Sequence, residues 1–490
     1  MRSTTRILAL PCLALLGYTT VRAATTSFVH DESLSYSWFT NRPLQDLWNL
    51  QPASANHHFL NSVAMRVARF TLGTSELALR FHSLLAHLVY LVASLFLVGR
   101  FRSRLLAVTV FALLNLNPFV LDFFSLARGY GLMVAFSLAA LTVATRPVGV
   151  ADDRLSGDLL AVALSGLGVL ANLSAVLFAI ALVMVLCAVN LWAPFQSGGS
   201  QQRTLKRAVV SSLALAAAGG LIVGWALPRG LALKEAGELY AGGERGFWVD
   251  TVGSLVDATR YDVAQPKWML RLFRRLIATA VIAQWGLIGL RVWRREFGRI
   301  VPLFIPTAIL LTIAACSMLQ HHYLDSRFLH GRTAIFLIPV FFVSLGHFAD
   351  DLWSTSGRYL QHAVQVVTIV AVVIQALLSF NLRSFHVWRY DADTREAVFA
   401  LAELQHLPAG QPLKLAATWL FEPTVNYYIA THELGWLPVD RVGMVGAFDY
   451  YLVQGGLVPD EDAQLSGLCT RVMREFASGT RLLRNCATPE

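Results

Sequence analysis

Long apolar segments separated by short polar turns run through most of the chain. An α-helix needs about 20 predominantly apolar residues to cross the hydrocarbon core of a bilayer, so segments of this kind predict transmembrane helices. The pattern therefore predicts an α-helical polytopic membrane protein with about 11 transmembrane helices. The predicted spans cover residues 7–26, 77–98, 105–120, 131–145, 208–227, 276–293, 300–319, 333–349 and 363–380, with two more inside 159–195.

Arginines gather in short turns between these segments, as in 100–104 and 291–299. Short cytoplasmic loops carry an excess of Lys and Arg, so the amino terminus is predicted to be cytoplasmic and the carboxyl terminus external. A cleaved signal peptide is the alternative for the first span, because Arg2 and Arg6 precede an apolar run that ends in small residues. We favour a retained helix at 7–26, which tolerates Arg22 near its outer end.

Two longer polar segments, 25–76 and 228–275, are the predicted external loops. Within the first of them, Phe59, Val63 and Phe70 recur at helical spacing. Such spacing predicts an amphipathic helix that lies along the membrane surface with its apolar side toward the lipid.

The composition changes after residue 380. Residues 381–490 contain 9 Lys or Arg and 13 Asp or Glu, so their net charge is −4, while the whole chain carries +9. We therefore predict a transmembrane domain at 1–380 and a small extracytoplasmic α/β domain at 381–490. In an oxidising compartment, Cys469 and Cys486 of this second domain could form a disulfide.

The overall composition narrows the class of protein. With 55% hydrophobic residues, 14% charged residues and a mean hydropathy of +0.53, the chain departs from an ordinary soluble protein. Its positive charges lie in short turns beside apolar segments, and no basic stripe carries interleaved aromatic residues, so a nucleic-acid partner is not expected. No third metal ligand stands at suitable spacing from the paired histidines His57-His58 and His321-His322. We therefore predict neither a metal nor another cofactor.

Two adjacent acids, Asp31 and Glu32, follow the first span and are the candidate catalytic residues. One interpretation is structural, because Asp31 could cap a helix that begins at Glu32. The other is catalytic, because ionised groups close to lipid are costly and tend to be functional. In that interpretation one acid is a general base for a lipid-borne substrate.

Basic residues predicted to be external are candidates for binding a phosphate. Arg128 and Arg327 depart from the trend that keeps arginine on the cytoplasmic side, and each could bind a lipid head group or a specific phosphate. Arg332 is a weaker candidate of the same kind. The remaining substrate-binding candidates are His57, His58, Tyr130, Lys267, His321 and His322.

Several of these residues stand in recognisable stretches. The acidic pair is followed by Asn-His-His-Phe-Leu-Asn at 56–61, by Leu-Gly-Thr-Ser-Glu-Leu-Ala-Leu-Arg at 72–80, and by Ala-Arg-Gly-Tyr at 127–130. In combination they resemble the polytopic lipid-dependent glycosyltransferases of the GT-C fold, especially the bacterial branch of protein O-mannosyltransferases and aminoarabinose transferases. Many members of that branch have His-Pro-Pro and Arg-Pro-Tyr where this chain has His-His-Phe at 57–59 and Arg-Gly-Tyr at 128–130.

The resemblance implies a multi-pass enzyme of the inner membrane. It would transfer a sugar with inversion from a polyprenyl-phosphate donor to a hydroxyl of a glycan, lipid or protein acceptor on the extracytoplasmic side. Asp31 would be the catalytic base, with Glu32 as the alternative. A transporter, flippase or polymerase of lipid-linked glycans, or a non-catalytic relative, is the competing hypothesis. Apolar spans with charges concentrated at the outer surface favour chemistry at the interface over transport.

Overall fold

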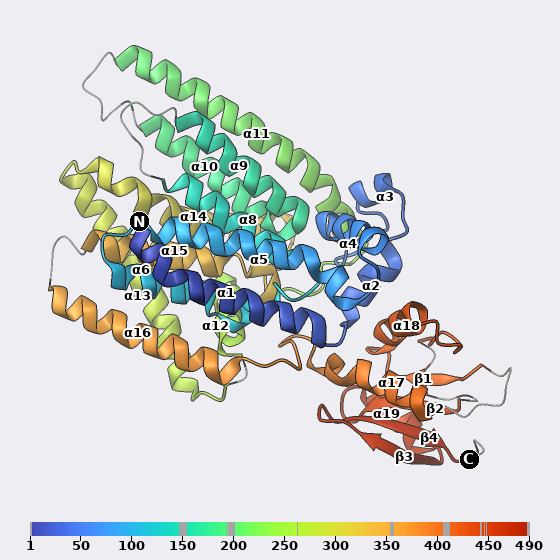
Figure 1. Cartoon of the computed structure of the whole chain (residues 1–490). Helices are drawn as coiled ribbons and strands as arrows, with labels where there is room; N and C mark the ends of the chain where they lie inside the picture. The colour runs from blue at the N-terminus through green and yellow to red at the C-terminus, as the bar shows by residue number, and fades with distance from the viewer. Residues whose placement is uncertain are drawn as a thin grey trace.

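The computed structural model describes residues 2–146, 154–192, 194, 201–261, 263–352, 357–404, 412–441, 443–444, 446 and 448–487. A bundle of long helices forms most of the molecule, and a small sheet with its own helices lies beyond one end of that bundle (Figure 1). The chain is a multi-pass membrane protein with a small α/β unit near its carboxyl terminus, as the hydropathy pattern predicts.

Each predicted span coincides with a helix in the described part of the chain. These helices are α1 (Arg2–Thr25), α5 (Glu76–Val98), α6 (Arg104–Asn115), α8 (Gly129–Ala144), α9 (Arg154–Ala171), α10 (Val176–Trp192), α11 (Gln201–Glu235), α13 (Lys267–Trp293), α14 (Phe297–Leu324), α15 (Leu337–Leu352) and α16 (Arg358–Ser379). Among the described residues, 8 helices are long and apolar enough to cross a membrane. The predicted end of the sixth span at Phe195 lies outside the described residues.

The helices α6, α8 and α15 are shorter than the others, with 12, 16 and 16 residues. The predicted third span is interrupted, because α6 ends at Asn115 and α7 (Pro118–Asp122) begins a new helix. The Asn117 side chain accepts a hydrogen bond from the Val120 N–H at 3.2 Å, and Pro118 suits a first helical position. A helix start therefore stands where the apolar pattern alone predicts a continuous helix.

The second predicted external loop is partly helical. Helix α11 continues through Pro228 to Glu235, beyond its predicted end at residue 227. Arg229 donates hydrogen bonds to the Trp48 carbonyl and the Asn49 side chain, which ties this extension to the first external segment. The other elements of this region are η3 (Phe247–Val252), α12 (Gly253–Arg260) and the first turns of α13, which begins at Lys267.

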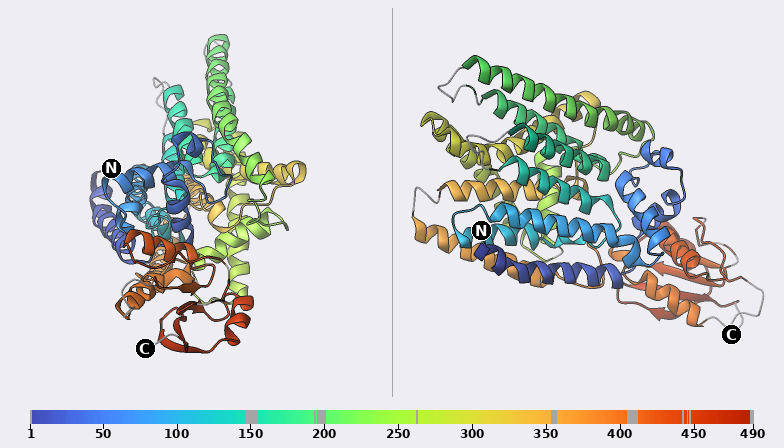
Figure 2. Two further views of the ribbon diagram at one scale, coloured as in Figure 1. Left: turned by 90° about the vertical axis from the view of Figure 1, so that its right-hand side faces the viewer. Right: turned by 45° about the horizontal axis from the view of Figure 1, so that its top comes forward.

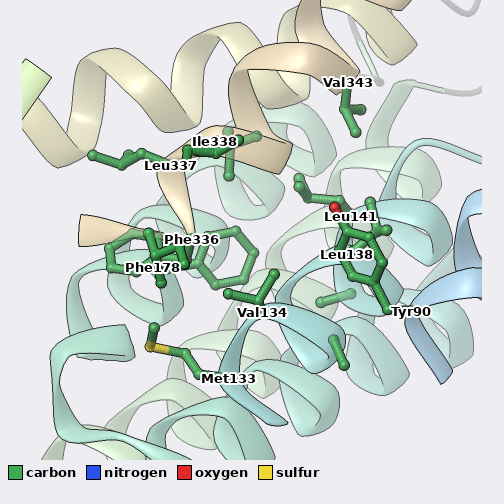
Figure 3. Packing of buried hydrophobic residues seen from close by; sticks show 14 of the residues in the cluster. Tyr90, Met133, Val134, Leu138, Leu141, Phe178, Phe336, Leu337, Ile338 and Val343 are labelled. Carbon is green, nitrogen blue, oxygen red and sulfur yellow. The ribbon is translucent and has the colours of Figure 1, made fainter. Parts of the chain in front are cut away.

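Buried apolar side chains from several spans meet around α8 (Figure 3). Met133, Val134 and Leu138 of α8 are at most 1% exposed. They lie among Tyr90 of α5 and Phe336, which precedes α15. Because α8 is enclosed by its neighbours, its ends are fixed in space, and Arg128 stands at its amino-terminal end. The bundle is completed by η1 (Leu173–Ala175) and η4 (Gly331–Ala334).

Arg22, near the end of α1, is a buried charge with partners inside the protein. It is 1% exposed and forms an ion pair of 2.7 Å with Asp122. Its guanidinium also donates to the Ser384 carbonyl at 2.6 Å, and Tyr261 donates to Asp122 at 2.7 Å. A buried charge is stable only when it is paired and hydrogen-bonded, and Asp122 supplies that partner from a distant part of the chain.

The first predicted external loop forms three helices at one end of the bundle (Figures 1 and 2). They are α2 (His30–Phe39), α3 (Leu44–Trp48) and α4 (Phe59–Thr71). Helix α4 is the predicted amphipathic helix: Met65 and Ala68 are buried, while Val67 and Phe70 are more than half exposed. An exposed apolar face on such a helix is typical of a segment that lies in the membrane interface.

The C-terminal unit lies beside these helices (Figure 2). Its sheet has the strand order β1-β2-β4-β3, with β1 parallel to β2 and the other neighbours antiparallel. Cys469 and Cys486 form a disulfide, which the sequence leaves open. The elements of this unit are η5 (Arg389–Asp393), α17 (Thr394–Leu404), β1 (Leu415–Ala417), α18 (Glu422–Thr431), β2 (Tyr450–Gln454), α19 (Pro459–Ser466), β3 (Thr470–Glu475) and β4 (Thr480–Asn485).

Candidate active site

Helix α2 carries both candidate acids in its first turn. The helix begins at His30 with Val29 at the N-cap position, so Asp31 is its second residue and does not cap it. The carboxylate of Glu32 accepts the Val29 N–H at 3.0 Å instead. The structural interpretation therefore applies to Glu32, and the side chain of Asp31 is directed elsewhere.

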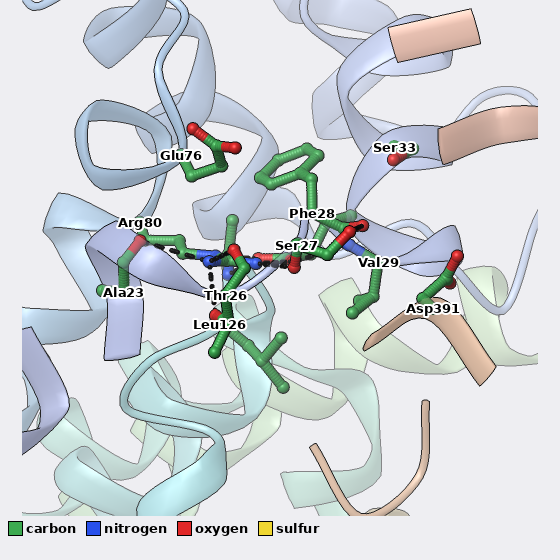
Figure 4. A network of polar contacts seen from close by, with 12 residues as sticks. Ala23, Thr26, Ser27, Phe28, Val29, Ser33, Glu76, Arg80, Leu126 and Asp391 are labelled. Atoms are coloured by element: carbon green, nitrogen blue, oxygen red, sulfur yellow. Dashed lines mark hydrogen bonds and ion pairs between the residues drawn. The ribbon is translucent and has the colours of Figure 1, made fainter. Parts of the chain in front are cut away.

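Glu32 is part of a buried polar network that joins α1, α2, α5 and the segment before α8. Its carboxylate forms an ion pair of 2.6 Å with Arg80, and both side chains are 0% exposed. Ala127 also donates its N–H to Glu32. Arg80 in turn donates to the carbonyls of Ala23 and Ser27, as Figure 4 shows. Both oxygens of Glu32 are thus occupied by protein donors.

Asp31 lies between two arginines and keeps contact with solvent. Arg332 donates to its Oδ2 atom at 2.7 Å, and a guanidinium nitrogen of Arg128 lies 3.6 Å from the same atom. The side chain of Asp31 is 13% exposed. Burial by itself would raise the pKa of this carboxyl, but the charges of Arg332 and Arg128 outweigh burial and hold the pKa below its usual value. Asp31 is therefore ionised at neutral pH.

Arg128 is fixed in place by several acceptors. It is 1% exposed and donates to the Asp31 carbonyl at 3.2 Å, the Ser35 hydroxyl at 2.9 Å and the Asn56 carbonyl at 3.2 Å. It also donates to the Nε2 atom of His58 at 3.0 Å. These bonds connect the start of α8 to α2 and to the loop before α4.

His58 is neutral, because burial and the nearby charge of Arg128 hold its pKa well below the usual value. An imidazole that accepts from Arg128 through Nε2 carries its proton on Nδ1. The ring of Tyr130 lies edge-on to His58, with a centroid distance of 5.3 Å. Of the sequence candidates, the structure thus brings Asp31, Arg128, His58 and Tyr130 together.

Gly129, between Arg128 and Tyr130, packs closely against another helix. A Cβ atom at this position would lie 1.9 Å from the Ala171 carbonyl oxygen and 2.9 Å from the Cβ of His58. No residue other than glycine fits without moving the backbone. This contact accounts for glycine here, where many members of the branch that the sequence resembles have proline.

Arg332 and Trp388 complete the arrangement. The guanidinium of Arg332 lies 5.0 Å from the centre of the Trp388 ring and 5.9 Å from that of Tyr130. At 29% exposure, Arg332 is more accessible than Arg128. The sequence ranked Arg332 below Arg128 and Arg327, because its contact with Asp31 joins positions 301 residues apart. It gave no signal for Trp388.

The other sequence candidates lie outside this cluster. The ring of His57 stacks on Phe39 at a centroid distance of 4.0 Å. Arg327 forms an ion pair of 2.8 Å with Glu244. Lys267 is exposed in the first turn of α13.

The paired histidines at the end of α14 are also separate from Asp31. His321 bonds to the Ser326 carbonyl at 2.8 Å, and His322 is exposed beside Tyr323. Within the described ranges, no group of three or more His, Cys, Asp and Glu side chains is arranged to hold a metal ion.

No protein-family model matches the sequence, and no curated protein matches it. Among solved structures, the chain resembles ArnT from Cupriavidus metallidurans in the apo state, with a TM-score of 0.52 and 12% identity over 100% of both chains. It equally resembles ArnT bound to undecaprenyl phosphate, with a TM-score of 0.52 and 11% identity over 99% of this chain and 100% of that one. At such low identity the likeness shows the fold, which is the predicted GT-C fold of polytopic membrane glycosyltransferases.

Proposed function

We propose that this protein is a membrane glycosyltransferase that moves a sugar from a polyprenyl-phosphate donor to an acceptor hydroxyl. The main support is Asp31, an ionised and partly exposed carboxylate held between two arginines at one end of a GT-C bundle. The likeness to a structure with bound undecaprenyl phosphate supports a polyprenyl carrier. The sugar is a hexose or a pentose, and the acceptor is a glycan, a lipid or a protein.

In the proposed reaction, Asp31 removes the proton from the acceptor hydroxyl as its oxygen attacks the anomeric carbon. The bond between that carbon and the phosphate oxygen breaks, and the phosphate leaves with the electron pair. Because attack and departure occur on opposite faces of the sugar, the anomeric configuration is inverted. A phosphate is already a good leaving group, so the protein has to orient the reactants and stabilise the developing charge.

Arg332 is the residue we assign to the departing phosphate. It is the more exposed of the two arginines, and its long side chain can turn away from Asp31 toward a phosphate on the opposite face of the sugar. When the donor phosphate binds Arg332, Asp31 loses the strongest charge that lowers its pKa. The carboxylate then becomes a stronger base at the moment when the acceptor must be deprotonated.

We assign the base to Asp31 rather than to Glu32 because Glu32 has no oxygen left for an acceptor. Arg80, Val29 and Ala127 all donate to its carboxylate, and the side chain is fully buried. Its proposed role is to fix the first turn of α2. Of the two acids that the sequence leaves open, the proposal therefore takes Asp31 as the base.

We also propose that the site faces the extracytoplasmic side of the inner membrane. Arginine-rich turns such as 100–104 and 291–299 favour a cytoplasmic position for the connections that they form. With the amino terminus in the cytoplasm, the end of α1 and all of α2 lie outside. In this arrangement residues 1–380 form the transmembrane domain, and residues 381–490 form an extracytoplasmic domain over the site.

Asp31→Asn tests the proposal in proteoliposomes, with undecaprenyl-phosphate-linked sugars as donors and a membrane glycolipid extract as acceptor. We expect loss of transfer by roughly 10²–10⁴-fold, the usual contribution of a general base. The matched control is Asp46→Asn in α3, which should retain the wild-type rate. Movement of the donor across the bilayer without product formation would instead favour the transporter, and full activity of Asp31→Asn would remove Asp31 as the base.

A further inference from the structure

The start of α2 is held by residues of the C-terminal unit. The backbone N–H of His30 donates to the Oδ2 atom of Asp391 at 2.7 Å. The His30 ring bonds to the Leu420 carbonyl through Nδ1 at 2.8 Å. Two residues before α2, the N–H of Phe28 donates to the Tyr428 hydroxyl at 2.8 Å, so hydrogen bonds to the C-terminal unit hold the backbone on both sides of Val29.

Asp391 holds the backbone of the residue directly before Asp31. It is 0% exposed, and its Oδ1 atom accepts the Thr394 hydroxyl at 3.0 Å, so both carboxyl oxygens have partners. Figure 4 shows Asp391 beside Val29 at the beginning of α2. The first N–H groups of a helix have no partner within the helix, and here one of them is satisfied by a residue of η5.

The anchored backbone belongs to the residue next to Asp31. Arg332 reaches the Asp31 carboxylate at 2.7 Å, and that contact requires the first turn of α2 to stay in place. A displacement of about 1 Å at a reacting group can lower a rate by about 10²-fold. The position of Asp391 therefore bears directly on the position of the proposed base.

We propose that Asp391 is a positioning residue, which sets the place of Asp31 by holding the His30 N–H at the start of α2. The inference rests on the proposed function and extends it, because it makes the C-terminal unit part of the active-site structure. Asp391 acts through the backbone of α2 and does not touch the substrate.

The protonation of Asp391 agrees with this role. Burial raises its pKa to about 8, so the carboxyl is mostly neutral at neutral pH. A neutral group can accept the His30 N–H without adding a second negative charge beside Asp31. The donor phosphate then approaches only one negative side chain, Asp31, together with the positive charges of Arg128 and Arg332.

Asp393 provides a matched control in the same short helix. It is 9% exposed, and its carboxylate accepts the Ser478 N–H at 2.6 Å. That bond stays within the C-terminal unit and does not involve α2. A variant at Asp393 therefore reports the general cost of losing a buried carboxyl from η5.

The kinetic test compares Asp391→Ala, Asp391→Asn and Asp393→Ala in the full-length protein. We expect Asp391→Ala to lower kcat by about 10–10²-fold with little change in the KM for the donor, as displacement of a reacting group would. Asp391→Asn keeps an amide oxygen for the His30 N–H and should restore most of kcat. Equal losses in Asp391→Ala and Asp393→Ala would show a merely structural role and overturn the inference.

Hydrogen exchange separates a failure of this inference from a failure of the proposed function. In Asp391→Ala, a peptide covering residues 28–36 should exchange faster than in the wild type, and in Asp393→Ala it should not. This readout does not depend on transfer. If the wild type transfers no sugar but the exchange differs as expected, the proposed function fails while Asp391 still positions α2. If the exchange at α2 is unchanged, the inference is wrong whatever the activity.

Discussion

Asp31 and Glu32 are neighbours in the first turn of α2, but they differ in burial and in their hydrogen-bond partners. On the inner side Glu32 is 0% exposed and receives donors from Arg80, Val29 and Ala127. On the outer side Asp31 is 13% exposed and meets the charged ends of Arg332 and Arg128. Successive helical residues point about 100° apart, so one acid faces the packed bundle and the other faces the two arginines and is partly exposed. The comparison separates an acid that holds the fold from an acid available for chemistry.

The largest effect should be the loss of stability on replacing Glu32, the buried acid. Glu32→Ala leaves the buried charge of Arg80 unpaired, and breaking a buried ion pair in this way costs about 3–5 kcal/mol. We expect a much lower thermal unfolding temperature and a poor yield of folded protein in detergent. Asp31→Asn, measured beside it, should change the unfolding temperature far less. Equal destabilisation by the two variants would remove the distinction between the two acids.

The next largest effect should be the loss of kcat on replacing Arg332. Loss of one preorganised donor to developing charge typically costs about 10²–10³-fold in rate, so Arg332→Gln should reduce kcat by about that factor. Arg332→Lys retains the charge but loses the fork geometry, and its activity should fall between those of the wild type and Arg332→Gln. Initial rates at saturating donor check this ranking of the wild type, Arg332→Lys and Arg332→Gln. A normal rate for Arg332→Gln would show that the phosphate binds elsewhere.

The smallest effects should come from candidates that lie outside the cluster. Arg327 forms an ion pair with the exposed Glu244, and exposed pairs contribute about 0–1 kcal/mol to stability. His322 is exposed at the end of α14. We expect Arg327→Ala and His322→Ala to keep transfer rates within about threefold of the wild type, which corresponds to less than 1 kcal/mol. A loss comparable to that of Arg332→Gln would move the site toward α14.

The membrane architecture could be predicted from the sequence because a bilayer imposes a length and an apolar composition on each span. Interruptions such as the one at Asn117-Pro118 depend on local capping, which the apolar pattern does not record. Arg128 could be found as an exception to the positive-inside trend in the predicted topology. Its environment could not be, since its partners come from α2 and from the loop before α4.

The distinction between Asp31 and Glu32 could not be made from spacing. It depends on Arg80 and Ala127, whose positions relative to α2 follow from the packing of α1, α5 and α8. The partners that the C-terminal unit supplies to α2 could not be predicted from the sequence for a similar reason. Asp391 lies 361 residues from His30 in the chain, and no periodic pattern relates them.

The central claim is that Asp31, held ionised by two arginines, is the catalytic base. The measurement that tests it most directly is the pH dependence of kcat/KM, which reports the ionisation of groups in the free enzyme. Because the charges of Arg332 and Arg128 hold the pKa of Asp31 below its usual value, Asp31 remains ionised until the pH falls through that lowered pKa. The account predicts that wild-type kcat/KM declines only below the usual pKa of an aspartate, about 4, and that Asp31→Asn has a low rate without this decline. The same acidic decline in Asp31→Asn, or a decline in the wild type at clearly higher pH, would contradict it.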